Sequence, residues 1–195
     1  HIYNTFNEFE ADIVDDVYEP KWFIDFIHDN LADGDEKCSE YYFNFVAHTC
    51  QKPWENPQIS PVMKGGQGTG KDTTIEITER IIGKSNDYVH RTTNINEILP
   101  KDGFNSELKN KFKEKYIAPY KQRNMARVIF SSNNESPVQF AFDERRFVLF
   151  KFSDKNKGNH EYWNMIWDKI NNSNEINNLY SWLLKRDISE WDPKD

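Results

Sequence analysis

The sequence predicts an α/β fold that is built around a phosphate-binding loop. A short apolar run, QISPVMK (58–64), leads directly into the glycine-rich stretch GGQGTGKDTT (65–74). The next residues have the apolar spacing of a helix, and Gly83 stands where a helix would end. ARVIFSSNN (126–134) predicts a second strand, and QFAFDERRFVLFKF (139–152) predicts a turn followed by a third. A strand, a glycine-rich loop and a helix in this order are the context that a P-loop requires.

Two helices are expected before this core. Residues 1–20 are acidic and irregular, and KWFIDFIHDNL (21–31) then carries apolar residues at helical intervals. GDEKCS (34–39) is a polar break, and EYYFNFVAHTCQKP (40–53) predicts a second helix that the proline ends. We expect His48 on this helix to pack or cap, because no partner His or Cys stands at metal-ligand spacing.

The helices after the loop show apolar faces. The face of the first is marked by Ile75, Thr78, Ile81 and Ile82. HEYWNMIWDKI (160–170) carries Tyr162, Ile166 and Ile170 on one face, and residues 175–186 predict a last helix. The chain is thus divided into an N-terminal helical segment, a P-loop core and a C-terminal helical segment (1–52, 53–153 and 154–195).

The composition indicates a folded intracellular protein. With 14 Phe, 9 Tyr and 6 Trp in 195 residues, the chain has the material for a packed core. Cys38 and Cys50 form no CxxC pair, which argues against a zinc or redox motif and for a reducing setting. The net charge of −7 argues against a surface that binds nucleic acid everywhere, but not against DNA contact through local Lys and Arg. No apolar run approaches the roughly 18 residues of a transmembrane helix, so we expect no membrane partner and no secretion.

The glycine-rich loop matches the pattern G-x-x-x-x-G-K-[ST] at every position but the last, where Asp72 stands. Backbone N–H groups of such a loop converge on phosphate oxygens, and the following helix directs its positive end at them. Lys71 would reach the β- and γ-phosphates, and Asp72 still offers an oxygen ligand to Mg²⁺. A glycine-rich turn without a ligand is the alternative, which the strand and helix on either side disfavour. The expected site for ATP and Mg²⁺ comprises Gly65, Gly66, Gln67, Gly68, Thr69, Gly70, Lys71, Asp72 and Thr73, with Asp72 as the metal ligand.

Two further stretches carry residues that suit phosphoryl transfer. Asn133 ends a predicted strand, where a polar side chain beside a P-loop can orient the attacking water, although ordinary turn chemistry accounts for it equally well. Arg145 and Arg146 precede the next strand, where an arginine from a neighbouring subunit could stabilise the transferred phosphoryl group. A surface ion pair with Asp143 or Glu144 is the alternative and, taken alone, the favoured one.

In this order, these stretches resemble the superfamily III helicase domain of viral and phage primase–helicases, the poxvirus-type group. The resemblance spans residues 40–193 and rests on AHTCQKPWENP, GGQGTGKDT, FNSELKNK, RVIFSSNNESPV, DERRF and LYSWLLKRDISEWDP. It implies an AAA-like P-loop fold with a three-layer core, homo-hexameric rings and ATP-driven translocation on single-stranded DNA during replication. It also implies a primase domain in the same full-length chain. Within the site it implies that Lys71 binds phosphate, that Asn133 is the sensor asparagine, and that Arg145 or Arg146 acts across the subunit boundary.

One element of that family has no counterpart in the sequence. Between FNSELKNK and RVIFSSNN the family has an apolar strand that ends in acidic residues, which hold Mg²⁺ and polarise water. Residues 84–126 contain no apolar run that ends in Asp or Glu. Three explanations are open. A stretch of the natural chain is missing near residues 110–116, which we favour; the protein binds ATP without hydrolysing it; or an acid from elsewhere takes the role.

DNA contact is expected in the basic segment KNKFKEKYIAPYKQRNMAR (109–127), at Lys121 and Arg123, although a solvated basic surface accounts for it equally well.

From the resemblance, the leading hypothesis is an ATPase and DNA helicase inside a host cell, in its cytoplasm, nucleus or a virus replication site. A ring-forming module that binds nucleotide without hydrolysis is the alternative. A P-loop kinase is a third, for which the sequence shows neither an acceptor pocket nor an arginine-rich lid.

Overall fold

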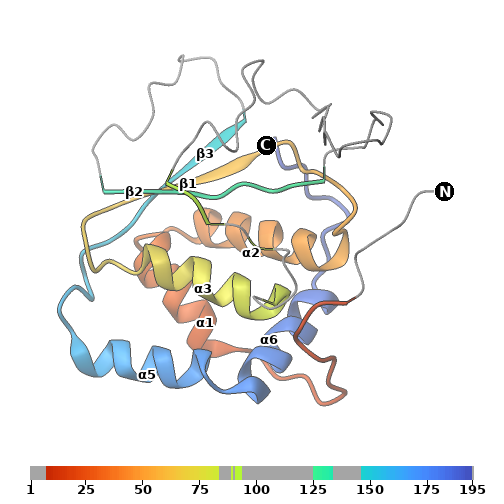
Figure 1. Cartoon of the computed structure of the whole chain (residues 1–195), viewed down its shortest axis with the longest axis horizontal. Helices are drawn as coiled ribbons and strands as arrows, with labels where there is room; N and C mark the ends of the chain where they lie inside the picture. The colour runs from red at the N-terminus through yellow and green to blue at the C-terminus, as the bar shows by residue number, and fades with distance from the viewer. Residues whose placement is uncertain (1–7, 84–88, 90, 94–124, 134–145, 195) are drawn as a thin grey trace, which may run out of the picture.

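Three parallel strands lie side by side in the order β2-β1-β3 in the computed structural model (Figure 1). The structure describes residues 8–83, 89, 91–93, 125–133 and 146–194. The strands are β1 (Ser60–Lys64), β2 (Phe130–Ser132) and β3 (Phe147–Lys151). In register, Val62 of the central strand is opposite Phe130 on one side and Leu149 on the other. The central strand is β1, so the glycine-rich loop that follows it begins at the carboxyl edge of the sheet.

The proline in the central strand costs the sheet no hydrogen bond. Residues of β1 bond alternately to the two neighbouring strands, and Gly65 donates its N–H to the Ser132 carbonyl at the end of β2 (3.3 Å). Pro61 faces the same neighbour, but the pairing with β2 begins only at Val62, opposite Phe130. Because no strand residue stands opposite Pro61 on that side, its missing N–H is tolerated.

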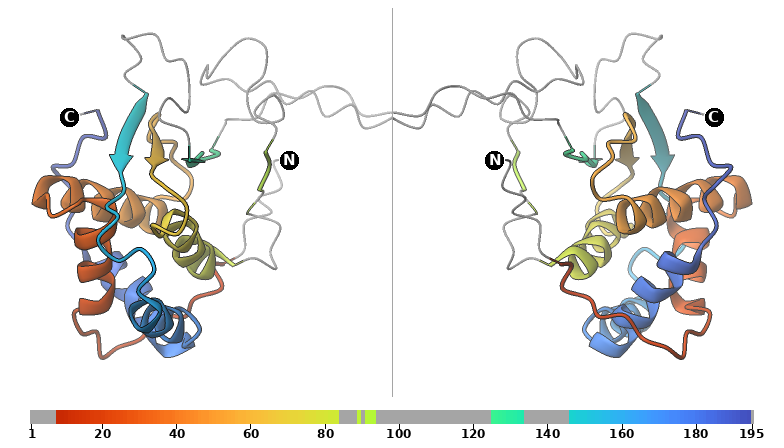
Figure 2. Two further views of the ribbon diagram at one scale, coloured as in Figure 1. Left: turned by 90° about the vertical axis from the view of Figure 1, so that its left-hand side faces the viewer. Right: turned by 90° about the vertical axis from the view of Figure 1, so that its right-hand side faces the viewer.

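The helices lie below the strands in the view of Figure 1, and Figure 2 shows the same separation from two further sides. Phe150 of β3 is fully buried against Tyr41 and Tyr42, whereas its neighbour Leu149 is 57% exposed on the opposite face. The helical elements are α1 (Lys21–Phe26), the π-helix η1 (Ile27–Leu31), α2 (Glu36–Gln51), α3 (Lys71–Ile82), α5 (His160–Ile170) and α6 (Ser173–Lys185). The predicted α/β class is confirmed, while the third layer of an AAA-like core stays a prediction.

One hydrophobic core takes side chains from all three predicted segments. Its fully buried members include Phe26, Tyr42, Phe150, Ile170 and Leu183. The division at residues 52 and 153 stays a prediction.

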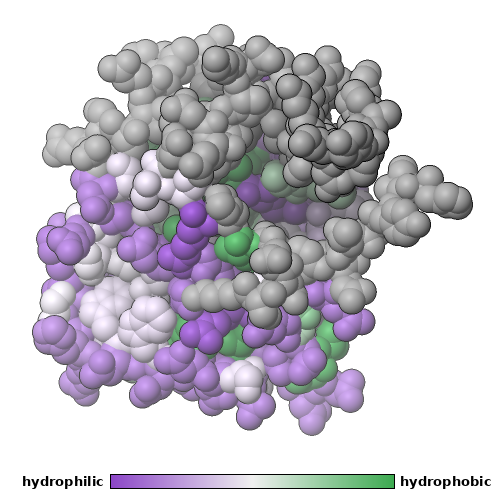
Figure 3. All heavy atoms as spheres, viewed as in Figure 1, coloured by the Kyte–Doolittle hydropathy of each residue, from purple (hydrophilic) through white to green (hydrophobic). Residues whose placement is uncertain are grey.

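Figure 3 shows a mostly hydrophilic surface around this core in the described part, with side chains of intermediate hydropathy over α5. None of the helices in that part combines the length and apolarity needed to cross a bilayer.

The predicted helix 21–31 is confirmed in extent but changes its winding halfway. The backbone N–H of Ala32 donates to the Ile27 carbonyl (3.0 Å), which is the wider π spacing. Asn30 is fully buried, and its side-chain amide donates to the Phe26 carbonyl (2.9 Å), the acceptor that the Asn30 backbone N–H would use in an α-helix. The side chain therefore competes with the α-helical pattern and widens this turn.

The second helix begins earlier than predicted. α2 starts at Glu36 because the Asp35 carboxylate accepts from the backbone N–H of Cys38 (3.0 Å) and caps the first turn. The polar break that was expected at 34–39 is therefore shorter, because residues 36–39 belong to α2. The expected packing role of His48 is confirmed, since it is 6% exposed and its ring lies edge-on to Trp191.

The apolar face predicted for α3 is only partly right. Ile81 is buried as expected, but Ile77 is buried with it, whereas Ile75 and Ile82 are half-buried. α3 lies in the middle of the molecule (Figure 1), and even Glu79 is only 3% exposed. A helix that is covered on nearly all sides has no single apolar stripe for the sequence to reveal.

Candidate nucleotide-binding site

The glycine-rich loop joins the end of β1 to the beginning of α3, as the sequence predicts. Gly68 and Gly70 adopt positive φ angles of 78° and 102°, which side-chain-bearing residues rarely take. Gly70 is also the N-cap residue of α3, so the loop ends where the first N–H groups of the helix have no partner within it. This arrangement directs backbone donors and the positive end of α3 toward one point, as phosphate binding requires.

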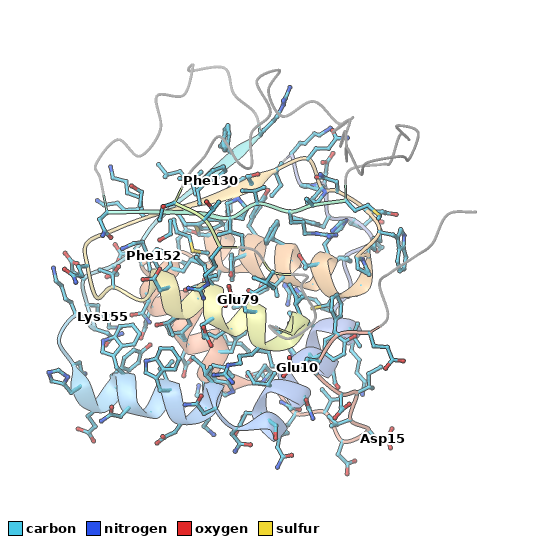
Figure 4. The ribbon with its side chains drawn as sticks, in the orientation of Figure 1. Glu10, Asp15, Glu79, Phe130, Phe152 and Lys155 are labelled. Carbon is cyan, nitrogen blue, oxygen red and sulfur yellow. The ribbon has the colours of Figure 1, made fainter. Side chains whose placement is uncertain are left out.

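Close packing fixes two of the glycines in the predicted pattern. A Cβ on Gly65 would lie 2.8 Å from Cβ of Phe152, and one on Gly70 would lie 2.7 Å from Cη2 of Trp163. Figure 4 shows Phe152 beside the amino end of α3. The loop is thus held between the end of β3 and helix α5, and at these two positions only glycine fits without displacement.

Lys71 is folded back onto the loop that precedes it. Its ammonium group donates to the carbonyls of Gly65 (2.8 Å) and Gly66 (2.6 Å) and lies 3.5 Å from the Thr69 hydroxyl. The residue is only 5% exposed, and burial lowers the pKa of Lys71, against the opposing charges of Asp72 and Asp154. The cation therefore lies inside the loop and can turn from its carbonyls to the oxygens of an anion there.

The two residues after Lys71 differ in exposure. Asp72 is exposed in the first turn of α3, whereas Thr73 is 7% exposed. A carboxylate at this position interacts favourably with the helix dipole without any ligand. No group of three or more His, Cys, Asp or Glu side chains suited to a metal ion occurs among the residues described. The role of Asp72 toward Mg²⁺ stays a prediction.

Asn133 is brought to the edge of the loop. It is exposed and directly follows Ser132, whose carbonyl accepts the N–H of Gly65 (3.3 Å). The position predicted for a sensor residue, at the end of a strand beside the P-loop, is therefore present in the structure. Its role in hydrolysis stays a prediction.

Arg146 lies at the other end of the sheet. Its carbonyl accepts from the N–H of Ser60 (2.6 Å), the first residue of β1, whereas the loop follows the last. A strand of this length separates Arg146 from the loop of its own chain, so any action on phosphate would have to be on a neighbouring subunit. Arg145, Lys121, Arg123 and the proposed gap near 110–116 lie outside the described residues, and their predicted roles stay predictions.

The segment after β3 also borders the loop, although none of the predicted site residues lies in it. A Cβ on Gly66 would lie 3.4 Å from Nζ of Lys157 and 3.5 Å from Oδ1 of Asp154. In parallel sheets, ligand-binding residues follow the carboxyl ends of the strands. The polar run that follows the apolar strand FVLFKF was therefore a usable signal.

Comparison with solved structures finds the same fold in the C-terminal region of NrS-1. Its A-form apo structure (305–718) matches with a TM-score of 0.72 and 15% identity, over 95% of this chain and 49% of that chain. Another A-form apo structure matches with a TM-score of 0.68 and 17% identity, and a further apo structure (305–718) with 0.65 and 16%, each over 95% of this chain and 50% of that one. The chain spans about half the length of these structures. No protein-family model and no curated protein matches the sequence.

Proposed function

We propose that this chain is the ATP-binding part of a DNA helicase of the viral and phage primase–helicase type, which couples ATP hydrolysis to translocation on single-stranded DNA during replication. Mg²⁺ would accompany the nucleotide, and the active form would be a homo-hexameric ring. The full-length protein would also carry a primase domain.

The observation that carries the proposal is the buried position of the Lys71 side chain against the carbonyls of the glycine-rich loop. Lys71 is 5% exposed at the amino end of α3, and its ammonium group is hydrogen-bonded to neutral loop carbonyls, the nearer at 2.6 Å. Burying a cation without a directly bonded anion is costly. The arrangement becomes useful when triphosphate oxygens replace the carbonyls as its partners. The position of Asn133 beside the same loop supports hydrolysis as the purpose of binding.

The likeness to the C-terminal region of NrS-1 supports the fold that the proposal requires. It reaches a TM-score of 0.72 over 95% of this chain. The helicase activity itself rests on the sequence motifs, from AHTCQKPWENP to LYSWLLKRDISEWDP, and on their order.

One observation favours a second function, a nucleotide-binding module that does not hydrolyse ATP. Residues 84–126 contain no apolar run that ends in an acidic residue, so the usual ligand that polarises water is missing from the sequence. Such a module would still bind nucleotide through Lys71 and could still form rings.

The test is ATP turnover with and without single-stranded DNA, with Lys71→Ala as the inactive control. The proposed helicase hydrolyses ATP, responds to DNA and loses turnover in the variant. Binding without turnover, in a sample whose mass matches 23.2 kDa, would favour the non-hydrolysing module. Turnover that single-stranded DNA leaves unchanged would favour a kinase, and absence of nucleotide binding would contradict all three.

A further inference from the structure

Two lysine side chains approach the same residue of the glycine-rich loop. Nζ of Lys71 lies 2.6 Å from the Gly66 carbonyl oxygen, and Nζ of Lys157 lies 3.4 Å from where a Gly66 Cβ would be. The Lys157 charge is also one of the causes, after burial, that lower the pKa of Lys71. Like charges repel each other, and an anion bound by both lysines would relieve that repulsion.

The segment that carries Lys157 is held in place by a buried polar network. The Asn156 side-chain amide donates to the Asn30 side-chain oxygen (3.1 Å), and the Ser153 N–H donates to the Asn30 carbonyl (2.8 Å). The Trp163 indole N–H donates to the Asn156 carbonyl (2.8 Å). Asn30 is fully buried and Asn156 is 8% exposed, so this network fixes the backbone on both sides of the turn. The side chain of Lys157, which is 52% exposed, can therefore reorient toward a ligand while its backbone stays in place.

An ion pair does not account for the placement of Lys157. Its Nζ lies 3.9 Å from Asp154, and the two side chains are 52% and 72% exposed, an arrangement that contributes little to stability. Its neighbour Lys155 provides a contrast, because Nζ of Lys155 lies 2.9 Å from Asp29. Figure 4 shows Lys155 on the segment that leads from β3 to α5. Two lysines of one short segment thus have different surroundings, and only Lys157 reaches the loop.

We propose that Lys157 is a second phosphate-binding residue, which leaves Asp154 and contacts the terminal phosphate of a bound nucleoside triphosphate opposite Lys71. The inference rests on the proposed nucleotide-binding function and names a ligand of that same site. The terminal phosphate is the partner because Lys71, which reaches the β- and γ-phosphates in P-loops, bonds the carbonyl of the same Gly66 that Lys157 approaches. Lys157 would then separate triphosphate from diphosphate, as a site that responds to hydrolysis must.

The experiment measures the affinity of the whole chain for Mg²⁺ with AMP-PNP and for Mg²⁺ with ADP by calorimetry. We expect Lys157→Ala to weaken AMP-PNP binding about tenfold or more, the loss of one charge-assisted hydrogen bond, and ADP binding by less than about threefold. Lys157→Arg should keep most of the AMP-PNP affinity. Lys155→Ala is the matched control, since it removes a lysine from the same segment and should change neither affinity.

Each contrary outcome is distinguishable. If Lys157→Ala and Lys155→Ala both bind AMP-PNP like the unchanged protein, the inference is wrong while the proposed nucleotide site stands. If Lys157→Ala weakens AMP-PNP and ADP equally, contact with the terminal phosphate is excluded. If the unchanged protein binds neither nucleotide, the proposed function fails and this inference fails with it.

Discussion

The indole ring of Trp163 lies against Gly70, the last glycine of the glycine-rich loop, so closely that a Cβ on Gly70 would be 2.7 Å from Cη2 of the ring. The same indole donates its N–H to the Asn156 carbonyl (2.8 Å) and packs edge-on against Phe26. Helix α5 therefore supports both the loop that holds Lys71 and the segment that carries Lys157. Through Trp163, α5 thus contributes to the candidate nucleotide-binding site although it is distant in sequence from the glycine-rich loop.

Gly70→Ala should destabilise the protein more than Gly68→Ala. Both positions have positive φ, which costs an alanine about 1–2 kcal/mol. An alanine at 70 also meets Trp163, whereas nothing lies within 4 Å of a Cβ at 68, so we expect about 1–3 kcal/mol more for Gly70→Ala. Urea unfolding of the two variants measures the difference. Equal losses of stability would mean that the loop does not pack on Trp163.

Asn30→Ala should weaken nucleotide binding through the segment 153–159. The change leaves the side-chain amide of Asn156 without its 3.1 Å partner and should cost about 2–4 kcal/mol of unfolding free energy. Asn178→Ala is the control, because Asn178 is also buried and bonds the backbone of Tyr18 (3.0 Å), in another part of the molecule. Both variants should be destabilised, but only Asn30→Ala should lose affinity for AMP-PNP. A similar loss of AMP-PNP affinity in both variants would mean that overall destabilisation of the protein, and not the position of segment 153–159, lowers the affinity.

The buried His48 should make the folded protein less stable at mildly acid pH. Burial and, next, the nearby Arg127 charge lower the pKa of His48 from 6.5 to about 4. The unfolded chain therefore binds this proton first, and stability is lost as the pH falls from 6.5 toward 4. Between pH 7.5 and pH 5 the loss should be about 2 kcal/mol. Denaturant titrations of the unchanged protein and His48→Gln at both values test it, and an equal pH effect in the two would contradict it.

Asn133→Ala should reduce ATP turnover by roughly 100-fold while leaving nucleotide affinity nearly unchanged, because a sensor residue acts on the attacking water and not on the bound ground state. Ser131→Ala, an exposed change on the same strand, is the control and should be neutral. Steady-state hydrolysis and calorimetry give the two quantities. Full ATPase activity in Asn133→Ala would contradict the sensor role and would mean that Asn133 is an ordinary turn residue at the end of a strand.

The strand, loop and helix from Ser60 to Ile82 could be predicted because their signals are local. The glycines, Lys71 and the apolar run before them specify this unit within a short stretch of chain. Asn133, directly after β2, could be placed beside the loop for a similar reason, since parallel strands present their carboxyl ends at one edge.

The remainder of the site depends on pairs that are distant in sequence. Asn30 bonds Asn156, and Gly70 touches Trp163, neither of which leaves a mark in the local pattern. The π turn of η1 depends on where the Asn30 side chain donates, so a helical spacing could not reveal it. For Lys157 the signal was weak, because a polar run after a strand marks the correct edge of the sheet but is most often a solvated turn.

The central claim is that residues 65–73 hold the phosphates of a nucleotide through Lys71, and calorimetry with Mg²⁺ and AMP-PNP tests it most directly. We expect the unchanged chain to bind with a dissociation constant between about 1 μM and 1 mM, and Lys71→Ala to bind at least about tenfold more weakly while remaining folded. Equal binding by the two proteins, or no binding by the unchanged chain, would contradict it.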